Sequence, residues 1–135
     1  MALVTCFEDL VIWKISREIV NDIHRDFKEL KDYNFKSQIY SAGFSIMNNI
    51  AEGFGRESKK EFHHFLDIAK GSCNEVKNMY YIAEDLKYVD ISTTQRRREK
   101  YEHEKNSIAK FMKYLKTKTG TKAQLNSKTA EQQHK

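Results

Sequence analysis

Proline is absent from this chain of 135 residues, and glycine occurs only five times. Because proline breaks helices and glycine weakens them, little in the sequence interrupts long helical segments. The apolar runs are too short to cross a membrane, and the first residues lack the pattern of a secretory signal. These absences predict an all-α protein that is cytoplasmic and does not enter a membrane.

Cysteine is also scarce. Cys6 and Cys73 are the two cysteines of the chain, and their separation fits neither a metal site nor a redox motif. We therefore expect two free thiols in a reducing compartment.

Charge is present in quantity but unevenly distributed. Residues 1–90 carry 12 basic and 15 acidic side chains, whereas residues 91–135 carry 12 and 4. The net charge of +5 is thus concentrated toward the C-terminal end. Such asymmetry indicates a polyanionic partner, although a solvated lysine-rich helix gives the same pattern.

The composition, with 39% hydrophobic and 32% charged residues, suits one domain with a modest core. We predict that residues 1–116 form this domain. Residues 117–135 are polar, rich in lysine and nearly devoid of apolar anchors, so they cannot offset the entropy of ordering. We expect them to form a disordered basic tail.

Apolar residues recur at spacings of three and four, which predicts four helices. Short connections between them favour an antiparallel up-down-up-down four-helix bundle. Capping boxes, in which a Ser or Thr is followed three residues later by Glu or Gln, mark three expected helix starts. The predicted helices cover about Glu8–Leu30, Ser37–Gly53, Ser58–Leu86 and Ser92–Leu115, with residues 31–36 as the first turn, and the boxes pair Thr5 with Glu8, Ser58 with Glu61 and Ser92 with Gln95.

The first helix carries more apolar residues than one bundle seam needs. Trp13, Val20 and Phe27 belong to the expected seam, and Ile12, Ile15 and Ile19 form a second row beside it. A wide apolar arc of this kind favours burial against another subunit. This arc is a first indication of a homo-oligomer, and the surplus apolar residues Ile12, Ile15, Ile19, Phe44 and Phe54 are consistent with a subunit interface.

The predicted second helix has two stripes of opposite chemistry. Ile39, Gly43, Ile46 and Ile50 share an apolar face. An adjacent polar row contains Gln38, Ser41, Ser45, Asn49, Glu52 and Arg56. Gly53 and Gly55 follow, and glycine tolerates the left-handed backbone that often ends a helix.

This region resembles the signature of the S23 family, the four-helix bundle proteins encoded in intervening sequences of 23S ribosomal RNA genes. Relatives of that family include the accessory variability proteins of diversity-generating retroelements. The resemblance implies a four-helix bundle, an association with RNA, and a ring-shaped homo-oligomer, typically a pentamer. It extends from Phe7-Glu8-Asp9-Leu10 and Trp13 through Gln38-Ile39, Ser45-Ile46, Asn49-Ile50-Ala51-Glu52-Gly53 and Arg56 to Phe62, Phe65-Leu66, Ala69, Gly71-Ser72 and Glu75.

The polar row is open to two interpretations. It could bind a ligand, but buried polar groups consistently find partners, which favours a network that bonds the second helix to the third through Glu75. Small facing residues would allow a close approach, and Gly43 and Gly71 suggest tight packing or a subunit contact. The residues of this structural motif are Gln38, Ser45, Asn49, Glu52, Gly53, Arg56, Gly71, Ser72 and Glu75.

The strongest functional candidate is the basic surface of the fourth helix, whose lysines and arginines could neutralise phosphates. The alternative is a solvated face with Glu99, Glu102 and Glu104 as local partners. The S23 pattern commonly carries basic residues after the second-helix glutamine, where this chain has Tyr40 and Ser41, so we expect RNA contacts on the fourth helix instead. The predicted nucleic-acid-binding residues are Arg96, Arg97, Arg98, Lys100, Lys105, Lys110, Lys113 and Lys116.

The sequence gives little support for a catalytic site or a metal site. Glu61 and His64 form one Glu-x-x-His motif, but di-iron bundles need two such motifs and two more inward glutamates. Neither cysteine has a placed base, and no nucleophile elbow is present. We therefore expect no metal, no cofactor and no enzymatic activity. The function predicted is a non-catalytic RNA-binding or RNA-associated oligomeric protein, and the alternative is a scaffold or accessory subunit of a reverse transcriptase.

Overall fold

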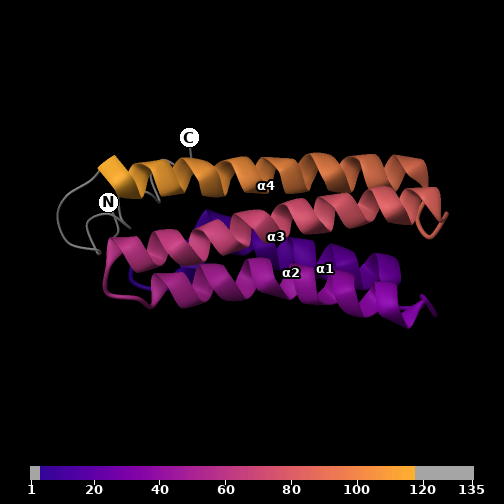
Figure 1. Cartoon of the computed structure of the whole chain (residues 1–135), viewed down its shortest axis with the longest axis horizontal. Coiled ribbons are helices and arrows are strands. Elements are labelled where there is room, and N and C mark those ends of the chain that lie inside the picture. Colours follow the sequence, from indigo (N-terminus) through magenta and orange to yellow (C-terminus); the bar gives the residue numbers. More distant parts are fainter. Residues whose placement is uncertain (1–3, 118–135) are drawn as a thin grey trace.

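The computed structural model of the chain describes residues 4–117. A short 3₁₀ helix, η1 (Phe7–Asp9), precedes four α-helices: α1 (Val11–Phe27), α2 (Tyr33–Phe54), α3 (Lys59–Asp85) and α4 (Ile91–Thr117). The helices run alternately up and down along one long axis (Figure 1). The predicted all-α four-helix bundle is confirmed. The predicted disordered tail lies, apart from Thr117, outside the described residues.

The helices pack in the order of the sequence. α3 packs along both α2 and α4, and α1 packs along α2, while the contact between α1 and α4 is the least extensive of the four. Because the chain alternates direction, the start of α3 and the end of α4 lie side by side at one end of the bundle (Figure 1). That adjacency positions the candidate site described below.

The starts of the first two helices were misplaced, and the fourth helix begins within one residue of its predicted start but with a different cap. Only Ser58 caps as expected, accepting a hydrogen bond from the backbone N–H of Glu61 at 3.1 Å. Asp32 caps α2, which therefore begins at Tyr33 inside the predicted turn, and Asp90 accepts from the N–H of Thr93 at the start of α4. Carboxylates at these positions satisfy the orphan N–H groups that begin every helix.

The first helix differs most from the prediction. Instead of one helix from Glu8, the chain forms η1, then an extended residue at Leu10, and only then α1. The capping box between Thr5 and Glu8 is wrong, because neither η1 nor α1 has a side-chain cap. Leu10 is fully buried, so this short break turns an apolar side chain into the core.

The core contains the second apolar row of the first helix. Ile12 and Ile19 are 0% exposed, and Ile15 and Phe54 are partly buried against the core. The expectation that Ile12 and Ile19 form a surface for another subunit is therefore wrong, because the bundle itself covers them. Phe44 is the member of that set that remains open, at 47% exposure.

Several glycines differ from the prediction in their backbone conformation or packing. Gly55 has ordinary right-handed dihedrals and Gly53 lies within α2, so the predicted left-handed helix end is wrong. The left-handed residue is Lys87, between α3 and α4. A Cβ on Gly43 would lie 2.5 Å from Ile23 Cδ1, which confirms tight packing there. Gly71 is exposed with open space around it, so it is not a packing spacer within the chain.

Both thiols are free, as predicted. Cys73 lies in the core at 1% exposure, and burial raises the pKa of its thiol. Cys6 is partly exposed beside η1, and its hydrogen bond to the Asp9 carboxylate raises its pKa.

Candidate nucleic-acid interface

Arg97, near the start of α4, points into the bundle and bonds to α1. Its Nε and Nη2 donate to the two carboxylate oxygens of Asp26 at 2.8 and 2.9 Å, and its Nη1 lies 3.4 Å from Asp22. Lys100 adds ion pairs to Asp22 and Glu18 at 3.0 and 2.9 Å. The hydrogen bond to Asp26 raises the pKa of Arg97. These charges join α1 to α4, the pair of helices with the least extensive contact of the four described above.

Two more predicted RNA contacts are also engaged within the chain. Arg98 donates to Glu84 at 2.9 Å and lies over the Tyr81 ring at 4.1 Å, with only 12% of its side chain exposed. Hydrogen bonds from Thr94 and Arg98 lower the pKa of Glu84. Lys105 pairs with Glu102 at 2.8 Å, which lowers the pKa of that carboxyl. Arg98 and Lys105 therefore neutralise local carboxylates.

Arg96 is different because it is exposed. It donates to the hydroxyls of Ser92 and Thr93, one turn earlier in α4, at 3.0 and 3.3 Å. It stands alone at this end of α4, since Arg97 and Arg98 turn inward.

The remaining predicted residues lie at the other end of α4, where they meet lysines of α3. Two adjoining hollows, of about 490 and 260 Å³, follow the junction of these helices. His63 and Lys116 line both of them. We call this continuous surface the basic groove; its lysines are Lys59, Lys60 and Lys70 from α3 and Lys110, Lys113 and Lys116 from α4.

The basic groove carries a large excess of positive charge. Asp67 is the carboxylate among its lining residues, and it lies 3.5 Å from Lys70. Within residues 4–117, Lys110, Lys113 and Lys116 form no ion pair. Lysine side chains in this state are hydrated point charges that can exchange water for phosphate oxygens.

His63 lies between the two halves of the groove. Partial burial lowers the pKa of its imidazole, and the nearby Lys116 lowers it further, while Asp67 opposes this. The imidazole is therefore mainly neutral at pH 7 in the free protein. His63, Lys59, Lys60 and Lys70 lie outside the basic set predicted from the sequence, which is confined to the fourth helix.

The signature segment in α2 acts mainly as a structural link. Ser72 of α3 donates to Ser45 Oγ at 2.7 Å, and the Asn49 amide donates to Ser45 Oγ and to its backbone carbonyl. The predicted network between the second and third helices is thus present, but Ser72 forms the link. Glu75, which was expected to form it, is exposed on α3.

The other signature residues divide between surface and core. Arg56, which follows α2, forms a surface ion pair with Glu52 in the last turn of α2 at 2.6 Å, and it also lies over the Phe65 ring. Gln38 is exposed. Gly53 is buried where a Cβ would lie 2.9 Å from Phe62 and Phe65 of α3, so it lets α2 and α3 approach closely.

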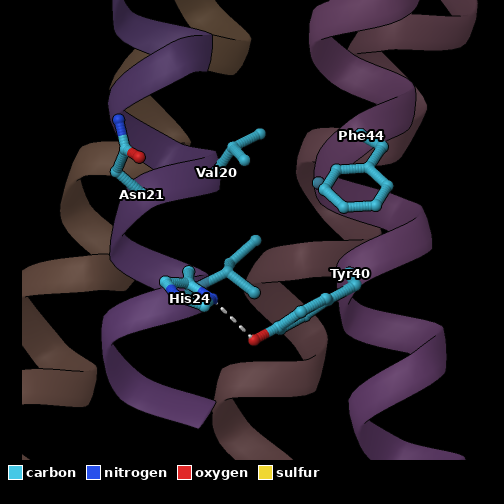
Figure 2. A pocket seen from close by; sticks show the side chains of 7 residues that line it. Val20, Asn21, His24, Tyr40 and Phe44 are labelled. Carbon is cyan, nitrogen blue, oxygen red and sulfur yellow. Dashed lines mark hydrogen bonds between the residues drawn. The ribbon is translucent and has the colours of Figure 1, made fainter. Parts of the chain in front are cut away.

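A second hollow, of about 170 Å³, lies between α1 and α2. Figure 2 shows Val20 and Phe44 at one side of it and the hydrogen bond between His24 Nδ1 and the Tyr40 hydroxyl, 3.1 Å long, at the other. Its walls are mainly apolar, and it is smaller than most ligand pockets, which are roughly 300 Å³ or more.

In residues 4–117, no group of three or more His, Cys, Asp or Glu side chains is arranged to hold a metal ion. No helix in that range is long and apolar enough to cross a membrane.

Residues 8–120 match the family model described as 23S rRNA-intervening sequence protein. The chain belongs to the 23S rRNA-intervening sequence protein family. The match covers most of the chain, including all four helices, the basic groove and the α2 signature. The resemblance found in the signature residues is confirmed.

A solved structure supports the fold of this 23S rRNA-intervening sequence protein. The crystal structure of a protein of unknown function from the S23 ribosomal protein family of Bacteroides thetaiotaomicron superposes with a TM-score of 0.72 at 22% identity, covering 76% of this chain and 99% of the other. No curated protein matches the chain. The likeness shows a shared bundle fold.

Proposed function

We propose that this protein is a non-catalytic RNA-binding protein that holds RNA phosphates in the basic groove. The observation that carries the proposal is the gathering of six groove lysines around one carboxylate, Asp67, from the first half of α3 and the last turns of α4, which the fold brings together. Charge neutralisation with counterion release supplies most of the affinity in sequence-independent binding. The family's description as a 23S rRNA-intervening sequence protein supports RNA as the polyanion.

Five of the eight predicted basic residues take one of two roles. Lys110, Lys113 and Lys116 contact phosphates. Arg97 and Arg98 stabilise the bundle, because each is mostly buried and bonded to a carboxylate. The lysines of α3 complete the site. No base-reading motif is evident, so we expect little sequence preference from the groove.

The test is a titration of the full chain with a single-stranded RNA and a matched DNA duplex over a salt series, with the oligomer mass measured in each buffer. Replacing Lys110, Lys113 and Lys116 with Gln should weaken RNA binding and reduce the salt slope by about two, since each lost phosphate contact removes about 0.7 from the slope for single strands.

The matched control removes the same charge at the other end of the bundle. Lys28 and Lys31 are exposed after α1, and Arg96 is exposed at the start of α4. Changing these three to Gln should leave the affinity and the slope close to the wild-type values. Equal losses in both triple variants would place the binding surface elsewhere, and no binding even at low salt would refute the proposed function.

The oligomeric state of the protein bears on RNA binding. We propose a homo-oligomer, a pentamer by family resemblance, which would present several basic grooves to one RNA. Linked sites bind more tightly than separate ones when one ligand can reach them together. A monomeric mass under conditions of tight RNA binding would contradict this part.

A second candidate, a protein-interaction scaffold or an accessory subunit of a reverse transcriptase, is favoured by one observation. Phe44 is 47% exposed beside the apolar hollow between α1 and α2 (Figure 2). Exposed aromatic side chains next to apolar hollows are typical anchors of protein interfaces. Phe44→Ala should leave RNA affinity unchanged if this surface serves a protein partner.

A further inference from the structure

His63 lies at the point where the two halves of the basic groove meet. It is on the first turns of α3, partly exposed, and it lines the hollow beside Lys59 and Lys60 as well as the hollow beside Lys110 and Lys113. Within the described part of the chain, its ring makes no hydrogen bond to another residue. Both ring nitrogens are therefore open to a ligand.

The charges around His63 come from both helices that form the groove. α3 contributes Lys59, Lys60, Lys70 and Asp67, and α4 contributes Lys110, Lys113 and Lys116. The cations exceed the single carboxylate, so an added proton on His63 is disfavoured while the groove holds only water. Burial and Lys116 lower the pKa of His63 accordingly.

A phosphate in the groove would reverse the preference of His63 for its neutral form. Its negative charge favours a charged neighbour, and an imidazolium offers two N–H donors to phosphate oxygens. We propose that His63 couples RNA binding to proton uptake: its imidazole is neutral in the free protein and takes a proton from solvent when an RNA phosphate occupies the groove. This inference rests on the proposed function, and it adds a regulation of the same site.

The coupling makes RNA affinity depend on pH. Because bound RNA favours the protonated form, affinity rises as pH falls from about 8 through the pKa of His63 in the complex and toward its lowered pKa in the free protein. By linkage, the affinity gain approaches about tenfold for each unit by which RNA raises the pKa of His63. Above and below that range, the protonation state is the same in both forms of the protein, and the dependence flattens.

The experiment measures the affinity of the full chain for a fluorescent uridine oligonucleotide across this pH range at constant salt. Wild type should bind more tightly as pH falls. His63→Gln should lose most of that dependence and bind like wild type at high pH. His63→Lys, which keeps a charge at every pH in the range, should bind tightly throughout.

His64→Gln is the matched control. His64 is the next residue, it is exposed, and it lines neither half of the groove. This variant should keep the wild-type pH dependence. Circular dichroism across the same pH values should show that all the variants stay folded.

The possible outcomes separate the two proposals. RNA binding with the same pH dependence in His63→Gln as in wild type would overturn the proton coupling while leaving the RNA-binding function intact. Absence of RNA binding at every pH would overturn both. Calorimetry in two buffers of different ionisation enthalpy gives an independent readout: wild type should take up protons on binding at neutral pH, and His63→Gln should take up fewer.

Discussion

Glu104 is a carboxyl group buried in the core of the bundle without a hydrogen-bond partner. Its residue is 1% exposed, and neither carboxyl oxygen has a partner within the described residues. Burial raises the pKa of Glu104 well above its ordinary value, and the charge of Glu18 adds to this, while Lys100 opposes it. The neutral form is therefore favoured in the folded protein and the charged form in the unfolded chain.

Glu104→Gln should raise the melting temperature increasingly as pH rises. A raised folded-state pKa means that the folded protein binds the proton more tightly, so stability is full below the unfolded pKa of about 4.5 and falls as pH rises toward the folded pKa. Gln cannot ionise and avoids that loss, which is roughly 1 kcal/mol per pH unit in this interval. Thermal melts at several pH values measure the difference.

Glu99, exposed on the same helix, provides the control for this substitution. Glu99→Gln should leave the pH dependence of the melting temperature unchanged. A Glu104→Gln curve that runs parallel to wild type at all pH values would show that Glu104 finds a partner or solvent in solution.

Sequence reasoning at this scale identified the right residues more often than the right contacts. The α2 polar row was recognised as a link to the third helix, but Ser72 and not Glu75 forms it, because rotation of α3 about its axis places Ser72 inside. Arg97 was predicted to bind RNA, but it is bonded within the bundle. This role could not be predicted because its partners Asp22 and Asp26 are more than seventy positions away in the sequence and only the fold brings them together.

At the scale of elements, two glycines of similar appearance in the sequence have opposite environments. Gly53→Ala should lower stability, because a Cβ would approach Phe62 and Phe65 to 2.9 Å at the α2–α3 contact. Gly71→Ala should raise stability by up to about 1 kcal/mol, since Ala is the better helix former and nothing lies within 4 Å of the new Cβ. Urea unfolding of both variants tests this pair. A loss of stability in Gly71→Ala, together with a changed oligomer mass, would show that Gly71 packs against another subunit.

Helix number could be predicted because apolar periodicity persists through each helix, but helix caps could be predicted only in part. A capping box identifies Ser58 correctly, whereas Asp32 and Asp90 cap through a carboxylate that sits in what the sequence indicates as turn. The break at Leu10 could not be predicted from the sequence either. Its burial requires an extended residue between η1 and α1, and local propensity contains no signal for this.

At the scale of the whole molecule, the basic groove is a product of topology. The sequence shows the excess of positive charge in the C-terminal part, including Lys110, Lys113 and Lys116, but not the lysines of α3 that lie beside them. The antiparallel order that it predicted implies that the start of the third helix lies beside the end of the fourth. That implication was the available signal for Lys59, Lys60, His63 and Lys70.

The fold as a whole also controls the reactivity of the two thiols. In the native protein, a maleimide should modify Cys6, which is partly exposed, and leave Cys73, which is 1% exposed, unmodified. Both should react in guanidinium chloride, as mass spectrometry would show. Cys6→Ser should remain unlabelled until it is unfolded. Rapid native labelling of that variant would mean that the bundle opens around Cys73.

This difference in access gives the protein a natural attachment point for a reporter. Cys6 precedes η1, at the end of the bundle where α1 begins, α3 begins and α4 ends, which is also the end that carries the basic groove (Figure 1). A dye on Cys6 would sit near an arriving nucleic acid without altering any groove lysine. Energy transfer to a labelled oligonucleotide could then show which end of the strand enters first, and so whether the groove holds RNA in one polarity or in both.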